Sequence, residues 1–161
     1  MAGSQLQGDS AGAGGFGYER FAGPGNRADL SNTAWLLMAM RATQGVEDLR
    51  PAGAKKTDID WAASLKFIEK LQIQDKEDAE NHGGFVYEVG GERGKSMVVQ
   101  KKGVVKLCGY GSMTYAGLES MIYAQVAKDD PRVRSALDWA MRHWTVEENP
   151  GMGSKGLFYF Y

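Results

Sequence analysis

The stretch GGFGYERFAGPGNRADLSNTAWLLMAM, residues 14–40, runs from a glycine-rich loop into a segment of bulky apolar side chains. Its opening triplet, GGF, returns at 83–85, and a looser form, GLF, stands at 156–158. The copies start 69 and then 73 residues apart. A spacing this regular predicts an internal repeat in which each copy of the loop opens one structural unit.

Two helical patterns lie between successive copies of the triplet. The predicted helices run from after Asp29 to Gly45, from Thr57 or Asp58 through Leu71, over 112–127, and from Pro131 onward. The first and third are apolar around most of their circumference, whereas the second and fourth carry more charge. We therefore expect the first and third helices to form an inner layer and the other two to form an outer layer.

The predicted domain covers residues 14–161, with repeat one at 14–82, repeat two at 83–155 and the start of a third at 156–161. Residues 1–13 are small and polar, so we expect a flexible leader; they lack the apolar centre of a signal peptide, and the compartment stays undetermined. Repeat two has a longer connection, which contains SMVVQKKGVVKLC at 96–108. Its two β-branched runs predict a small β-hairpin, whose lysines are expected to protect a solvated edge.

Composition excludes several classes of protein. The chain has 161 residues, enough for one domain with a core, and a net charge of -1, which favours neither nucleic acid nor an anionic membrane as a partner. One cysteine, Cys108, excludes an intrachain disulfide and a multi-thiolate metal site. Because no apolar run approaches the ~20 residues of a spanning helix, we expect no membrane span.

Three segments carry a resemblance to a known family. They are GGFGYERFAGPGNRADLSNTAWLLMAM at 14–40, GGFVYEVGG with CGYGSMTYAGLESMIYA at 83–91 and 108–124, and DDPRVRSALDWAMRHWTVEENPGMGSKGLFYFY at 129–161. They resemble the prenyltransferase and squalene-cyclase (squalene oxidase) repeat superfamily, in particular a bacterial branch of repeat proteins. The resemblance implies an all-α fold, an α/α toroid whose inner helices surround a cavity. It also implies that two helix pairs are a fragment of the toroid, so we expect further repeats or self-association to cover the inner layer.

The resemblance allows a test for cyclase chemistry. Squalene-type cyclases protonate an alkene with an Asp in an Asp-x-Asp-Asp-Thr-Ala motif at the start of an inner helix. The matching residues here, 29–34, read DLSNTA: Asp29 is retained, but Ser31 stands at the proton donor's position. A hydroxyl is far too weak an acid to protonate a double bond. Asp29 and Ser31 are therefore interpreted as helix caps, as the remnant of an active site, or as polar groups that line one end of a cavity.

Metal and thioester chemistry find no support in the same comparison. Protein prenyltransferases bind zinc through an Asp-x-Cys pair and a distant His, and the pair's positions here hold Cys108 and Tyr110. The thioester motif CGEQ of complement-type relatives is also missing, since Gly109 and Tyr110 follow Cys108. We expect no metal, no cofactor and no catalytic residue in this segment.

The candidate ligand-binding side chains lie at the starts and along the first turns of the two inner helices. They are Asp29, Ser31, Trp35, Tyr110, Ser112 and Tyr115. The aromatic members could line a cavity for an isoprenoid or another apolar small molecule, or they could pack between helix layers. Trp61, Trp139 and Trp144 on the outer helices are expected to pack, and Gln72 with the second GGF resembles the Gln/Trp element that ties one helix pair to the next.

Three functions stay open at this stage. The first is a non-catalytic binding or scaffold module for an isoprenoid-like ligand or a partner chain. The alternative is part of a terpenoid cyclase or prenyltransferase whose catalytic residues lie outside this segment. A glycan-processing toroid would need paired carboxylates in a cleft, and the acidic run at 75–80 is expected to be merely solvated.

Overall fold

The structure is a computed structural model that describes residues 2–19, 27–54, 58–89, 97–101 and 104–152. A short 3₁₀ turn, η1 (Ala2–Ser4), precedes four helices and one hairpin. The elements are α1 (Leu30–Asp48), α2 (Trp61–Leu71), β1 (Met97–Lys101), β2 (Val104–Cys108), α3 (Gly111–Tyr123) and α4 (Pro131–Arg142). The prediction of a mostly helical chain is confirmed. The expected start of a third repeat, 156–161, lies outside the described residues.

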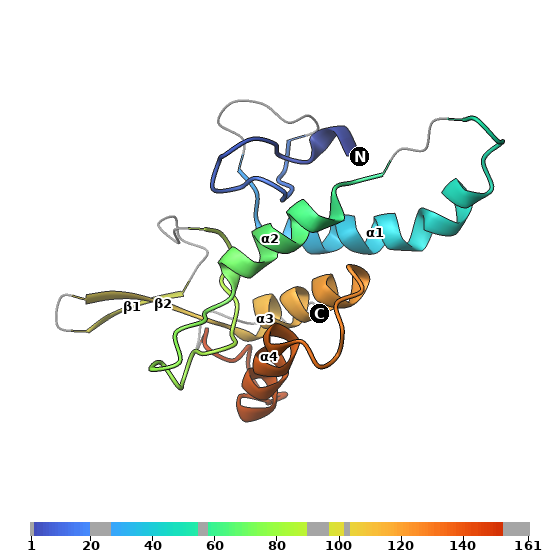
Figure 1. Cartoon of the computed structure of the whole chain (residues 1–161). Coiled ribbons are helices and arrows are strands. Elements are labelled where there is room, and N and C mark those ends of the chain that lie inside the picture. Colours follow the sequence, from blue (N-terminus) through green and yellow to red (C-terminus); the bar gives the residue numbers. More distant parts are fainter. Residues whose placement is uncertain (1, 20–26, 55–57, 90–96, 102–103, 153–161) are drawn as a thin grey trace.

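The four helices of the described residues pack against one another. α3 lies alongside α1, and this is the most extensive contact between helices; α4 packs on α3, and α2 contacts both α1 and α3 (Figure 1). The core between them is formed by fully buried side chains such as Leu37, Phe67 and Met121. None of the helices in the described part of the chain is long and apolar enough to cross a membrane.

Caps define the helix boundaries. Asp60 accepts a hydrogen bond from Ala63 N at the start of α2, and Asp130 caps α4 with Pro131 in its first turn. The prediction that α1 stops at Gly45 is wrong, because the helix continues to Asp48. α3 ends earlier than predicted, since Gln125 adopts a left-handed φ of 59°.

The predicted hairpin is present, and β1 pairs antiparallel with β2, Met97 opposite Cys108. Lys106 of β2 reaches back to the loop that follows α2, where its Nζ lies 2.7 Å from Oδ2 of the buried Asp78. Burial opposes the charge of Asp78, but hydrogen bonds from Lys106 and Asn81 outweigh burial and lower the pKa of that carboxyl. The expectation that the acidic run is merely solvated is therefore wrong for Asp78, which is buried and paired with Lys106.

Two glutamines make matching sets of hydrogen bonds at the two GGF loops. Gln72 Nε2 donates to the carbonyl oxygens of Gly83 and Arg132 and to Ser135 Oγ. Gln5 Nε2 donates to the carbonyl oxygens of Gly14 and Asp60 and to Ser64 Oγ. The structure thus corrects the expectation of a flexible leader, because Gln5 and Leu6 are buried. The repeat boundaries themselves stay a prediction.

The two GGF loops are also held alike. Phe16 N donates to Thr33 Oγ1 at 3.0 Å, and Phe85 N donates to Thr114 Oγ1 at 3.1 Å. Gly83 has a φ of 92°, and a Cβ there would overlap the carbonyl of Ser135 on α4. Only glycine fits such a position, where a left-handed backbone meets another main chain closely.

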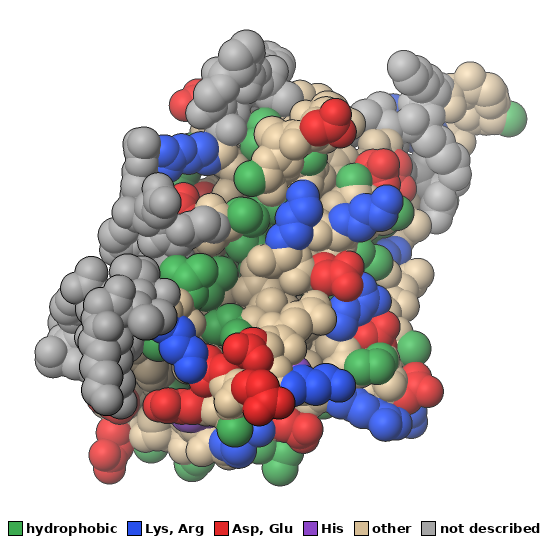
Figure 2. Space-filling view, turned by 60° about the vertical axis from the view of Figure 1, so that its left-hand side comes forward, with side chains coloured by type: hydrophobic (Ala, Val, Ile, Leu, Met, Phe, Trp, Pro, Cys, Tyr) green, Lys and Arg blue, Asp and Glu red, His purple; other side chains and the backbone are tan. Residues whose placement is uncertain are grey.

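Basic and acidic side chains are interspersed on the coloured part of the face in Figure 2. The prediction that three tryptophans pack against other helices is confirmed only in part. Trp139 is buried as predicted and Trp61 is partly buried. The prediction that Trp144 packs is wrong, since its side chain is 68% exposed.

Candidate functional site

The best-supported candidate site is the start of α1, where the sequence places Asp29. Asp29 directly precedes the helix and is only 5% exposed. Its Oδ1 accepts a hydrogen bond from Asn32 N, and its Oδ2 accepts one from Asn32 Nδ2, both at 2.8 Å. This is the geometry of an N-cap, in which the side chain satisfies a free N–H of the first turn.

Two tyrosines, one exposed and one buried, connect the carboxylate of Asp29 to the surface. The hydroxyl of the exposed Tyr18 lies 3.1 Å from that of Tyr87, which is buried. Burial raises the pKa of Tyr87 strongly, and hydrogen bonding to Tyr18 and the negative charge of Asp29 raise it further. The phenol of Tyr87 therefore keeps its proton at neutral pH, between the surface and the buried Asp29.

The segment Phe85–Tyr87 joins the starts of α1 and α3. The carbonyl oxygen of Tyr87 accepts a hydrogen bond from Leu30 N at 2.8 Å, and that of Phe85 accepts one from Tyr110 N at 3.3 Å. The predicted residues at the two helix starts therefore lie at the same end of the molecule, on either side of three residues of the second GGF loop.

The predicted side chains at the start of α3 are largely occupied by other parts of the fold. Tyr110 is buried and Tyr115 is partly buried against the core. Asn149 Oδ1 accepts a hydrogen bond from Ser112 N, and Asn149 Nδ2 donates to Ser112 Oγ, both at 2.9 Å. Since Tyr110 makes no capping hydrogen bond through its side chain, Asn149 caps the start of α3 instead. The sequence did not predict this role, because Asn149 lies 37 residues from Ser112.

Ser31 and Trp35 complete the predicted set on α1. Ser31 is half-buried, and Trp35 keeps about half of its side chain in solvent. Sequence reasoning missed Tyr18 and Tyr87, although a signal was present, since each follows the Phe of a GGF triplet by two residues.

The chemistry open to this site is limited. Both oxygens of Asp29 accept hydrogen bonds, and no second acid stands beside it at 30–34. Among the described residues no group of three His, Cys, Asp or Glu side chains could hold a metal ion. The arrangement can position helices and hydrogen-bond a polar ligand group.

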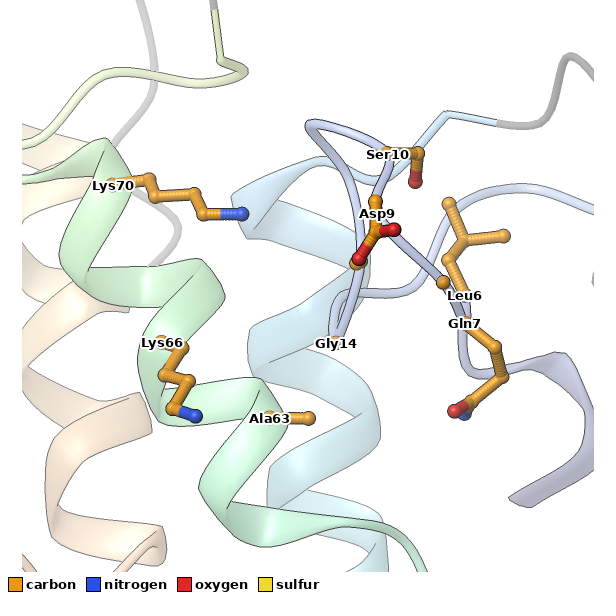
Figure 3. Close-up of a pocket in the computed structure, with 10 residues that line it drawn as sticks. Leu6, Gln7, Asp9, Ser10, Gly14, Ala63, Lys66 and Lys70 are labelled. Atoms are coloured by element: carbon orange, nitrogen blue, oxygen red, sulfur yellow. The ribbon is translucent and has the colours of Figure 1, made fainter.

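A separate pocket of about 430 Å³ opens between the loop 6–14 and α2 (Figure 3). Lys66 and Lys70 extend from α2 on one side, and Asp9 and Ser10 lie on the loop opposite. Lys70 Nζ lies 3.5 Å from the carbonyl oxygen of Ala11, which bridges the two walls. None of the predicted binding residues lines this pocket.

Comparison of the chain with family models, with curated proteins and with solved structures found no match. The geometry of the chain's own residues therefore carries the functional conclusions.

Proposed function

We propose that this chain is a non-catalytic repeat module of the α/α-toroid type, which serves as a scaffold for an apolar, isoprenoid-like ligand or a partner chain. The observation that supports it best is the pair of matching ties made by Gln5 and Gln72. Each glutamine connects a GGF loop to the start of the outer helix that follows that loop, α2 or α4, through two carbonyl oxygens and a serine hydroxyl. Units tied in this way stack side by side and expose extended surfaces, as in other repeat proteins.

The start of α1 supports a binding role over a catalytic one. Asp29 is held as a cap, and Ser31 at the proton donor's position is too weak an acid. Trp35 is half-exposed on α1 and Tyr115 is partly buried on α3, so both offer aromatic surface to C–H groups of an apolar ligand.

Native mass spectrometry of the purified chain with farnesol tests this function. We expect a bound species, weakened by Trp35→Ala and by Tyr115→Ala but not by Leu49→Ala, which truncates an exposed side chain just past α1. Equal binding by all variants would refute the assignment of the ligand site.

The same samples, incubated with farnesyl diphosphate, separate a scaffold from an enzyme. Unchanged substrate is the expected outcome. Release of diphosphate, abolished by Asp29→Asn, would contradict the non-catalytic proposal and favour a cyclase or prenyltransferase.

A further inference from the structure

The repeat allows each position of one unit to be compared with its equivalent in the next. Thr33 and Thr114 make the same bond to a Phe N–H, which aligns α1 with α3. The carbonyls of Ala63 and Ser135 meet the left-handed glycines Gly14 and Gly83, which aligns α2 with α4. Residues with a given role in repeat one can therefore be found in repeat two.

The inner helix of repeat one meets repeat two through a polar side chain. Arg41 on α1 donates from Nε to the carbonyl oxygen of Tyr123 at the end of α3, at 2.6 Å. The equivalent position on α3 is Ile122, whose side chain is 65% exposed. The position that contacts the next unit in repeat one is thus apolar and uncovered in repeat two.

Two further positions, at the ends of α2 and α4, show the same change from a polar contact to an exposed apolar side chain. In repeat one, Glu69 lies 3.8 Å from the guanidinium of Arg132 on α4, and Gln72 donates to the carbonyl of Arg132. Their equivalents at the end of α4 are Met141, 77% exposed, and Trp144, 68% exposed. Three positions that make polar contacts between units in repeat one are therefore exposed and apolar in repeat two.

We call this group of exposed apolar side chains the α4 face. It consists of Ile122 on α3, Leu137 and Met141 on α4, and Trp144 and Val146 just after α4, all exposed. Leu137, Met141 and Trp144 follow one another at helical spacing along one side of α4 and its end. Exposed apolar side chains that gather on one side of a helix are typical of an interaction site.

We propose that a second copy of this chain covers the α4 face, with the two copies related by a two-fold axis so that each buries the same surface. The α4 face continues the positions through which repeat one already contacts repeat two. Because a second copy would be the partner chain of the proposed scaffold, this step rests on the proposed function.

Two residues favour a two-fold pair over a head-to-tail chain of copies. Trp144 stands where Gln72 makes the tie to the next unit, so that tie cannot be repeated at the end of α4. At the opposite end, the half-exposed Trp35 is the equivalent of Ala116, which is fully buried and small enough for close helix packing. A head-to-tail neighbour would lose the tie and meet a bulky indole, whereas a pair of α4 faces needs neither the glutamine tie nor the end of the molecule that carries Trp35.

Sedimentation velocity of the full chain across a range of concentrations tests the proposal. We expect a monomer–dimer equilibrium that stops at the dimer. Met141→Glu and Trp144→Glu each place a charge in the interface and should weaken the dimer at least about 30-fold, the effect of losing a central anchor. Leu49→Glu and Trp35→Glu should leave it unchanged; circular dichroism confirms that each variant folds.

A chain that stays monomeric at every concentration would overturn the proposal. So would a dimer unaffected by both α4 substitutions, or a series of ever larger species, which indicates head-to-tail association. Farnesol binding that persists in a monomeric chain would refute the dimer alone, because the ligand test depends on Trp35 and Tyr115 rather than on the α4 face.

Discussion

The side-chain amide of Gln72 donates a hydrogen bond of 2.8 Å to the carbonyl oxygen of Arg132, in the first turn of α4. Gln72 itself directly follows α2, so one buried amide connects the end of α2 to the start of α4. Gln5 makes the matching 2.8 Å bond to the carbonyl oxygen of Asp60, ahead of α2. The chain thus uses a glutamine side chain to fix the start of both α2 and α4.

Replacing Gln72 with Ala is expected to destabilise the fold by about 1–3 kcal/mol, because one buried and two partly buried acceptors lose this donor. Gln5→Ala should have an effect of similar size. The measurement is urea unfolding followed by circular dichroism. Gln74→Ala, at an exposed position two residues on, serves as the control and should change the free energy of unfolding by less than about 0.5 kcal/mol. If Gln72→Ala behaved like this control, the tie would have no role in stability.

Substitutions at two glycines allow the cost of backbone strain to be measured separately from the cost of steric overlap. Gly53 and Gly83 have nearly the same left-handed φ, 86° and 92°, but only at Gly83 would a Cβ overlap another main chain. Gly53→Ala should therefore cost about 1–2 kcal/mol, the strain of a left-handed residue with a Cβ. Gly83→Ala should cost clearly more or prevent folding, as thermal unfolding would reveal. Equal costs would mean that α4 can move away from the loop.

The cap of α4 predicts a specific pH dependence. Hydrogen bonds from Arg132, opposed by burial, lower the pKa of Asp130 from 3.8 to about 2. Since the folded chain binds this proton less readily than the unfolded chain, the carboxylate stabilises the fold above about pH 4. That contribution is lost as the pH falls toward about 2.

Asp130→Asn keeps a capping oxygen but removes the charge. We expect it to be less stable than the natural chain by about 1 kcal/mol at pH 7, as for a partly exposed ion pair, and equally stable near pH 2. Chemical unfolding at several pH values measures the difference. Asp138→Asn, on the exposed side of α4, is the control. A difference that stayed constant down to pH 2 would rule out the charge as its source.

Local patterns predicted the elements better than the contacts between them. The helices and the hairpin followed from apolar spacing and turn signals, whereas the role of Gln72 was expected from the resemblance to the Gln/Trp repeat element. Gln5 was missed because it lies among small polar residues that resemble a leader, and only its distant partners on α2 explain its burial. Trp144 was expected to pack because it is aromatic, but exposure depends on whether another unit covers α4.

At the candidate site, too, the sequence predicted local contacts but not contacts between distant residues. Asp29 was identified from its place before an apolar segment, and its bonds to Asn32 are local enough to follow from sequence. Tyr87 comes from the other repeat and meets Asp29 only through the fold. Asn149 likewise reaches Ser112 from beyond α4. Such pairings depend on long-range packing, which single-sequence periodicity does not encode.

The two threonines that hold the GGF loops offer the sharpest test of the repeat. Thr114 Oγ1 accepts the hydrogen bond from Phe85 N and donates to the carbonyl oxygen of Tyr110. Thr114→Val preserves shape but leaves the buried N–H of Phe85 without an acceptor, so we expect a loss of about 1–3 kcal/mol in the free energy of unfolding. Thr33→Val should match it, because Thr33 makes the same two bonds to Phe16 and Asp29. Thr43→Val on the exposed end of α1 is the matched control, and chemical unfolding of all three variants should place it within about 0.5 kcal/mol of the natural chain. A loss at only one of the two loops would mean that the repeats share a geometry but not its energetic role.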